Sequence, residues 1–248
     1  MNIKLTLSYD GTGYHGWQEQ RNARAVQGVL LAAIKCVMSD ATGVQGVSRT
    51  DSGVHALSYV ANFHTQKSIP PENIVKALNS NLPLDIRVLN AEIADDDFHA
   101  QFDCKNKTYF YRICNNEIQS PFERNYSWHF PYKLDIDKMR QATKFIIGTK
   151  DFSSFCASGD ERENRIRTVN SLNILEIPGQ ARNDIIEIEI NADGFLYNMV
   201  RIIAGTLIEV GNGKINSADI EGIIASKDRT KAGVTAPAQG LFLKEVFY

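Results

Sequence analysis

Several features that mark common protein classes are absent from this sequence. No segment approaches the roughly 20 consecutive apolar residues of a transmembrane helix, and residues 1–7 lack the long apolar region of a secretory signal peptide. The four cysteines, Cys36, Cys104, Cys114 and Cys156, form no Cys-x-x-Cys pair, which argues against a disulfide framework and a cysteine zinc site. We therefore expect a cytoplasmic protein with reduced cysteines and no membrane association.

Histidine is also sparse. The five histidines include no pair at i and i+4 and no H-E-x-x-H motif, so we expect no metal site. His55 follows Asp51 by four residues, and we expect it to position its neighbourhood.

An excess of basic residues is missing as well. The chain has 27 lysines and arginines against 29 aspartates and glutamates, which gives a formal net charge of −2. A nucleic-acid partner would therefore have to be held by a local basic patch. The 248 residues, of which 43% are hydrophobic and 23% charged, are typical of a globular protein of one or two domains with a substantial core.

The first part of the chain shows alternating strand and helix periodicities. Ile3, Leu5 and Leu7 alternate with polar residues, which predicts a half-buried strand, and apolar residues from Val26 onward recur at helical spacing. The expected elements are a strand at 2–9, a helix at 25–38, strands at 44–49 and 57–64, a helix at 70–81 and a strand at 86–89.

The second part repeats this order of elements without residue-level identity. Its expected elements are a strand at 107–115, a helix at 135–147, strands at 167–177 and 186–190 with a turn at Pro178-Gly179, helices at 197–210 and 218–226, and a strand at 241–247. We therefore predict an α+β fold of two tandem ferredoxin-like β-α-β-β-α-β halves, residues 1–104 and 105–248. Their antiparallel sheets should join around a central cleft, where ligand sites are often found.

Residues 11–16 match the G-x-G-x-x-G motif of dinucleotide-binding folds. In those folds the glycine loop opens directly into a helix, whereas here about nine residues, 17–25, precede the helical pattern. A structural turn is the better interpretation.

Asp51-Ser52-Gly53 resembles the Asp-Ser-Gly of aspartic proteases. That chemistry needs two carboxylates that share a proton, and the chain has no second such motif. Arg49 would also favour the ionised form of Asp51. A plain turn and a functional carboxylate both remain open for this segment.

Basic residues gather locally and aromatic residues lie among them. Such aromatics can stack on unpaired bases while the cations meet phosphates, although any single cluster also fits a solvated surface. The basic residues are Lys105, Lys107, Arg112, Arg162, Arg165, Arg167, Lys227, Arg229 and Lys231, and the aromatic ones are Tyr109, Phe110, Tyr111, Trp128 and Phe155.

A set of ordered motifs along the whole chain resembles the TruA family of tRNA pseudouridine synthases. They are YDGTGYHGWQ at 9–18, VQGVL at 26–30, SRTDSGVHA at 48–56, DFHA at 97–100, KTYFYRI at 107–113, DFSSF at 151–155, FLYNMVR at 195–201 and TAPAQGL at 235–241. The order and the end-to-end coverage make the resemblance far more specific than any one motif.

The resemblance implies an isomerase that converts uridine to pseudouridine without a cofactor or metal. Asp51 would be the catalytic carboxylate that attacks the uridine or its ribose, and Arg201 its guanidinium partner. Arg49 would help hold the base out of the RNA stack, Tyr109 would stack on that base, and Leu243 would line the pocket. The substrate would be the anticodon stem-loop of tRNA, at positions 38, 39 and 40 of the tRNA, and the enzyme a homodimer.

The chain departs from the family pattern at a few positions. Ser48 and Ser52 replace the usual Gly and Ala, and since all are small we expect the turn to form. Gln101 replaces a common Arg, and Asp103-Cys104 replaces small residues, which removes positive charge from the expected RNA face. A non-catalytic RNA-binding module of the same fold and an aspartic-type hydrolase are the two alternatives to be distinguished.

Overall fold

The computed structural model describes residues 1–160, 162–177 and 185–248, and its contacts divide the chain into two compact units. The first unit comprises Met1–Lys105 together with Phe242–Tyr248, and the second comprises Asn106–Leu241. Residues 242–248, expected in the C-terminal half, make their contacts with the first unit.

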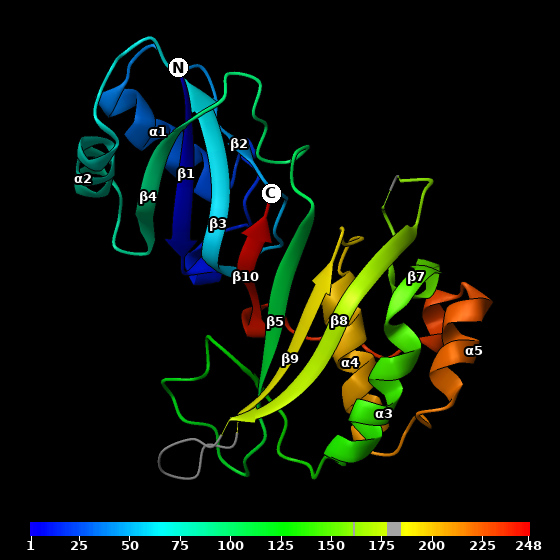
Figure 1. The fold of residues 1–248 in the computed structure, drawn as a ribbon. Helices are drawn as coiled ribbons and strands as arrows, with labels where there is room; N and C mark the ends of the chain where they lie inside the picture. The colour runs from blue at the N-terminus through cyan, green and yellow to red at the C-terminus, as the bar shows by residue number, and fades with distance from the viewer. Residues whose placement is uncertain (161, 178–184) are drawn as a thin grey trace. The chain divides into compact units, whose positions relative to one another are not determined.

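The first unit is a sheet covered by two helices (Figure 1). The strands follow the order β4 (Ile86–Ala94), β1 (Asn2–Tyr9), β3 (His55–His64) and β10 (Leu241–Phe247), and the short β2 (Gln45–Gly46) pairs with β3. The helices are α1 (Val26–Val37) and α2 (Pro71–Asn81). Ile3, Leu5 and Leu7 of β1 are fully buried, as their alternation with polar residues predicts.

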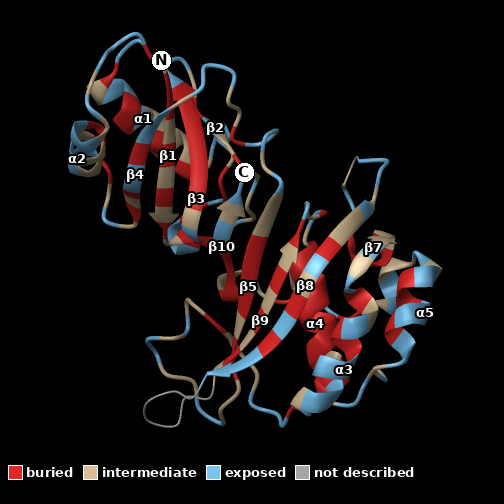
Figure 2. Ribbon diagram, in the orientation of Figure 1, coloured by how far each residue is buried: buried red, intermediate tan, exposed pale blue. Residues whose placement is uncertain are grey.

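The second unit packs three helices against an antiparallel sheet. The strands follow the order β5 (Asn106–Cys114), β9 (Ile185–Ala192), β8 (Ile166–Ile177) and β7 (Gly148–Asp151), and β6 (Trp128–His129) pairs with β5. The helices are α3 (Ile136–Ile146), α4 (Met199–Gly211) and α5 (Asp219–Ser226). Figure 2 shows that α4 is buried almost throughout, whereas α3 and α5 keep an exposed face.

The predicted α+β class with mostly antiparallel pairing is confirmed. The first unit also has the expected order of elements, β-α-β-β-α-β. The second does not repeat it in detail, because β6 precedes α3, β7 follows it, and β10 pairs with β3 of the first unit. The turn expected at Pro178-Gly179 lies outside the described residues, and the expected central cleft stays a prediction.

Three further features bear on function. No helix in the described part of the chain has the length and apolar character that a membrane span needs. All four cysteines are free, with Cys114 and Cys156 buried. Among the described residues, no group of three or more His, Cys, Asp or Glu side chains is arranged to hold a metal ion.

Candidate active site

Asp51 lies in an irregular turn between β2 and β3 that is fixed by backbone hydrogen bonds. The Trp17 N–H donates to the Thr50 carbonyl at 3.2 Å, and the Gly53 N–H donates to the Tyr14 carbonyl at 3.2 Å. Gly53 has φ +79°, which favours glycine. The turn is therefore held on both sides of Asp51, and the Asp51 residue itself is half-buried.

The partner of this turn is the glycine-rich segment 11–16. A Cβ at Gly11 would lie 2.0 Å from the Val54 carbonyl oxygen, and one at Gly16 would lie 2.1 Å from the Thr50 carbonyl oxygen. Both glycines therefore permit a backbone approach that no other residue allows. Because α1 begins only at Val26, the structure confirms the structural interpretation of this motif over the dinucleotide one.

Tyr14 is fixed by a small polar cluster of its own. Its hydroxyl donates to Asp85 Oδ1 at 2.5 Å, and the Arg24 guanidinium lies 4.6 Å from the centre of its ring. Burial and the hydrogen bond to Asp85 raise the pKa of Tyr14 far above its ordinary value, so the hydroxyl stays a donor. The Tyr14 carbonyl also accepts the Ser52 hydroxyl at 3.2 Å, so Ser52 supports the turn, which forms as expected.

His55 joins the turn to the first strand. Its Nδ1 lies 3.0 Å from the Gly11 nitrogen and 3.1 Å from Asp10 Oδ1, and its ring stacks on Phe242 at 4.5 Å. Only 1% of His55 is exposed. These contacts describe a residue that positions the start of β3.

Arg49 and Leu243 also lie in the first unit. Arg49 is exposed and follows Ser48, whose carbonyl accepts a hydrogen bond from the Tyr59 hydroxyl. Leu243 is buried and pairs in parallel register with Ala56, near the start of β3. The structure therefore brings Leu243 to the strand that directly follows the Asp51 turn.

Tyr109 and Arg201 belong to the second unit. Tyr109 lies on β5 opposite Ile190 of β9, and its ring meets the edge of Phe195 at 5.1 Å and 81°. Arg201 lies in the first turn of α4, where its Nε donates to the Ala236 carbonyl at 2.7 Å and its Nη1 donates to Asn198 Oδ1 at 2.8 Å. The Arg201 guanidinium is thus held in one orientation.

Asn198 is a site residue that sequence reasoning missed. It adopts a left-handed conformation, φ +59°, directly before α4, and it orients Arg201. Asparagine tolerates this conformation better than most residues. The sequence signal that could have identified Asn198 is its position three residues before Arg201, next to the predicted start of a helix.

Tyr111 anchors the segment that supports Arg201. Its hydroxyl donates to the Pro237 carbonyl at 2.7 Å, and its ring lies where a Cβ of Gly240 would stand. Burial raises the pKa of Tyr111 far above its ordinary value, partly opposed by the charge of Arg201. Residues 236–240 are therefore packed on both Arg201 and β5.

Comparisons with known proteins agree on one family. The family model described as tRNA pseudouridine synthase matches residues 6–103 and 142–248. The chain is 52% identical over 247 residues to "tRNA pseudouridine synthase A" of Thermoanaerobacter sp. (strain X514), covering 100% of this chain and 99% of the relative. It is 49% identical over 249 residues to "tRNA pseudouridine synthase A 2" of Clostridium tetani (strain Massachusetts / E88), covering 100% and 98%.

Solved structures show only a distant likeness. The crystal structure of the archaeal box H/ACA sRNP Nop10–Cbf5 complex matches 92% of this chain and 59% of that chain, with a TM-score of 0.36 and 11% identity. The sequence matches span the whole chain and include the turn that carries Asp51. The chain therefore belongs to the tRNA pseudouridine synthase family.

Proposed function

We propose that this protein isomerises uridine to pseudouridine in the anticodon stem-loop of tRNA, at positions 38, 39 and 40, with Asp51 as the catalytic carboxylate. The observation that carries the proposal is the Asp51 turn, in which a half-buried carboxylate stands in backbone held by Tyr14 and Trp17. Catalysis by a single carboxylate depends on such fixed placement, because small errors in geometry cost large factors in rate.

The chemistry is an internal rearrangement. The bond between C1′ of the ribose and N1 of the base breaks, the base turns, and C1′ bonds to C5. The proton lost from C5 is balanced by the proton gained at N1, so the reaction consumes no oxidant, reductant or second substrate. An ionised carboxylate can serve as the nucleophile or as the base in this sequence.

The other proposed site residues bind and orient the uridine. Arg201 is assigned as the guanidinium partner of the Asp51 carboxylate, as the family resemblance implies. Arg49 helps hold the base out of the RNA stack, Tyr109 stacks on the extruded base, and Leu243 forms part of the pocket wall. The fixed orientations of Arg201 and Tyr109 in the second unit support these roles.

The partners of the reaction are tRNA and a second copy of the chain. Because the net charge is −2, binding of the RNA depends on local basic residues rather than on the whole surface. The homodimer follows from the family resemblance. Since tRNA is a cytoplasmic molecule, we infer that the enzyme acts in the cytoplasm.

The test is pseudouridine mapping on tRNA transcripts that carry uridine at only one of the three positions. We expect wild-type protein to form pseudouridine at each of them and Asp51→Asn to form none, while tRNA binding is retained. Asp96→Asn is the matched control, because Asp96 is an exposed aspartate of the same unit, and we expect full activity from it.

Each outcome decides a part of the proposal. Product from the Asp51→Asn protein would refute the role of Asp51, and product at other uridines would refute the assigned positions. Salt-sensitive tRNA binding without any product would favour the non-catalytic RNA-binding alternative.

A further inference from the structure

The loop between β9 and α4, residues 193–198, supports two of the proposed site residues at once. Phe195 of this β9–α4 loop packs its ring against the ring of Tyr109. Asn198, the last residue of the loop, accepts a hydrogen bond from Arg201. The loop therefore places the aromatic neighbour of Tyr109 and, together with the Ala236 carbonyl, orients the Arg201 guanidinium.

The start of this loop is tied to β8, but its middle is not part of the sheet. The Asp193 N–H donates to the Thr168 carbonyl at 3.1 Å, and the Thr168 N–H donates to Asp193 Oδ1 at 3.0 Å. Beyond Asp193 the backbone needs other partners, since a loop without them would be free to move.

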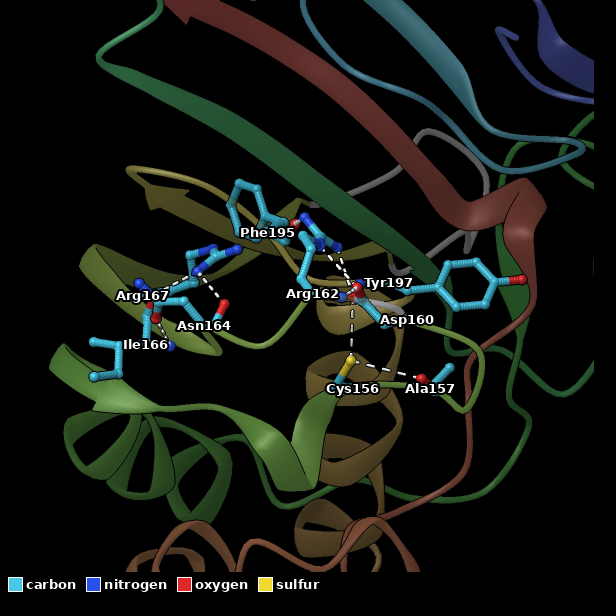
Figure 3. A network of polar contacts seen from close by, with 9 residues as sticks. All are labelled: Cys156, Ala157, Asp160, Arg162, Asn164, Ile166, Arg167, Phe195 and Tyr197. Carbon is cyan, nitrogen blue, oxygen red and sulfur yellow. Dashed lines mark hydrogen bonds and ion pairs between the residues drawn. The ribbon is translucent and has the colours of Figure 1, made fainter. Parts of the chain in front are cut away.

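Two of those partners are the side chains of Asp160 and Arg162, which we call the Asp160–Arg162 clamp (Figure 3). A third is the Ala157 N–H, which donates to the Tyr197 carbonyl at 3.0 Å. Asp160 Oδ2 accepts the Tyr197 N–H at 3.0 Å, and Arg162 Nη1 donates to the Phe195 carbonyl at 3.1 Å. The two side chains also bind each other in a two-pronged ion pair, with Nε–Oδ1 at 2.8 Å and Nη2–Oδ2 at 2.6 Å. The clamp thus hydrogen-bonds to one backbone N–H and one backbone carbonyl of the loop.

The environment keeps the clamp charged. The Asp160 side chain is only 4% exposed, and its hydrogen bond with Arg162 holds the pKa of that carboxyl well below its usual range. The Cys156 thiol donates to Asp160 Oδ2 at 3.4 Å, and burial together with Asp160 raises the pKa of this thiol. Cys156 therefore stays a neutral thiol that donates to the ionised carboxylate of Asp160.

We propose that Asp160 and Arg162 are positioning residues for the isomerisation. They hold Phe195 and Asn198 in place, and through them Tyr109 and Arg201. This inference rests on the proposed function, because it assigns the clamp to the support of side chains that handle the uridine. Neither clamp residue needs to touch the RNA.

Two other roles for the pair give different results. If Arg162 contacted a phosphate, its loss would weaken tRNA binding and reduce the salt dependence of that binding. If the pair were an ordinary surface ion pair, its loss would change little. A positioning role instead lowers the rate of the bound complex and leaves affinity intact.

The experiment measures single-turnover pseudouridine formation at saturating enzyme, the Kd for tRNA, and hydrogen exchange of residues 193–198 in the free protein. The variants are Asp160→Asn and Arg162→Gln, together with Arg162→Lys, which keeps the charge but loses the planar fork. The matched control is Arg140→Gln. Arg140 of α3 is exposed to a similar degree, 44% against 49%, and pairs with Glu176 of β8.

We expect Asp160→Asn and Arg162→Gln to lower the single-turnover rate by about 10- to 100-fold with an unchanged Kd and faster exchange in the loop. Arg162→Lys should restore the rate only in part, and Arg140→Gln should behave as wild type. Circular dichroism and melting temperature are recorded for each variant to show that it folds. Asp160→Asn and Arg162→Gln test the proposal separately, so a failure of one to fold leaves the other as the test.

Three results would overturn the inference. They are faster loop exchange with a wild-type rate, a weakened Kd with an unchanged rate at saturation, and full rescue by lysine. Wild-type protein that forms no pseudouridine would instead refute the proposed function itself, so the two failures are distinguishable.

Discussion

Gly16 offers the sharpest test of how the Asp51 turn is held. Replacing it by alanine places a Cβ 2.1 Å from the Thr50 carbonyl oxygen, at a residue whose φ is +81°. The positive φ costs an alanine roughly 1–2 kcal/mol. Relief of the overlap requires a backbone shift, which costs roughly 1–3 kcal/mol. We therefore expect Gly16→Ala to lower the free energy of unfolding by about 2–5 kcal/mol, a large share of the roughly 5–15 kcal/mol typical of a domain.

The assay follows urea unfolding through the fluorescence of Trp17, which is 2% exposed and belongs to the same unit. The chain has two tryptophans, so a Trp128→Phe background leaves Trp17 as the single reporter. Gly13→Ala is the matched control, because its Cβ would meet nothing closer than Arg24 Nη1 at 3.9 Å. We expect that control to be neutral or to stabilise the unit by about 0.4–1 kcal/mol.

The result that refutes this reasoning is a Gly16→Ala protein within about 1 kcal/mol of its Gly13→Ala control, since both costs argued above would then be missing. If the reasoning holds, pseudouridine formation should also fall more than stability alone explains. The Thr50 carbonyl that moves is one residue from Asp51. Activity measured well below the melting temperature separates the two effects.

Three further predictions test other parts of the structure. Tyr59→Phe removes the hydroxyl that donates to the Ser48 carbonyl, which should cost roughly 1–3 kcal/mol, and an unchanged melting temperature would contradict it. Burial raises the pKa of Tyr111 above its ordinary value of 10.0, so the unfolded chain loses that proton first and stability falls as the pH rises above 10. Tyr111→Phe should flatten this part of the pH–stability curve, and curves of equal slope would count against the assignment. Asn62→Leu removes a buried amide with three hydrogen bonds, and hydrogen exchange of residues 95–100 should accelerate; unchanged exchange would show that the amide does not hold that segment.

Periodic elements were predictable because burial of one face imposes their pattern. The helix expected at 135–147 forms at Ile136–Ile146, with Asp135 as its cap, and the helix expected at 25–38 forms at Val26–Val37. In both helices the apolar residues recur at helical spacing because one face of the helix packs against the core. The ends of these two helices differ from the expected ones by one residue, because helix ends fray. The strand expected at 86–89 extends further, to Ala94.

Elements set by distant partners were not predictable in the same way. The strand expected at 44–49 is reduced to Gln45–Gly46, where a Cβ on Gly46 would collide with the Tyr59 hydroxyl and the Trp17 ring. The strand β7 at Gly148–Asp151 has no apolar alternation and was missed, because its pairing with β8 is carried by the backbone. The residues of β10 likewise do not indicate that this strand pairs with β3.

The site shows the same division between local motif and distant support. The Asp51 motif and its flanking Arg49 were visible as a segment, and their roles stay predictions. The Asp160–Arg162 clamp was not visible as support, because its partners are backbone groups of a loop more than thirty residues away in the sequence. Every residue except proline offers the same backbone N–H and C=O, so hydrogen bonds to the backbone leave no trace in the residue type of the loop position.

The place of β10 has a consequence for the order in which the chain can mature. The first unit is discontinuous: Phe242 stacks on His55, the Lys105 N–H donates to the Phe247 carbonyl, and the Tyr248 hydroxyl donates to the Ala100 carbonyl. A ribosome delivers residues 242–248 only after the whole of the second unit has been translated. Until then the edge of β3 next to the Asp51 turn lacks its neighbour, so the first unit can be completed only after the second unit has been translated. A nascent chain arrested before residue 242 should hold a formed second unit beside an unfinished first one.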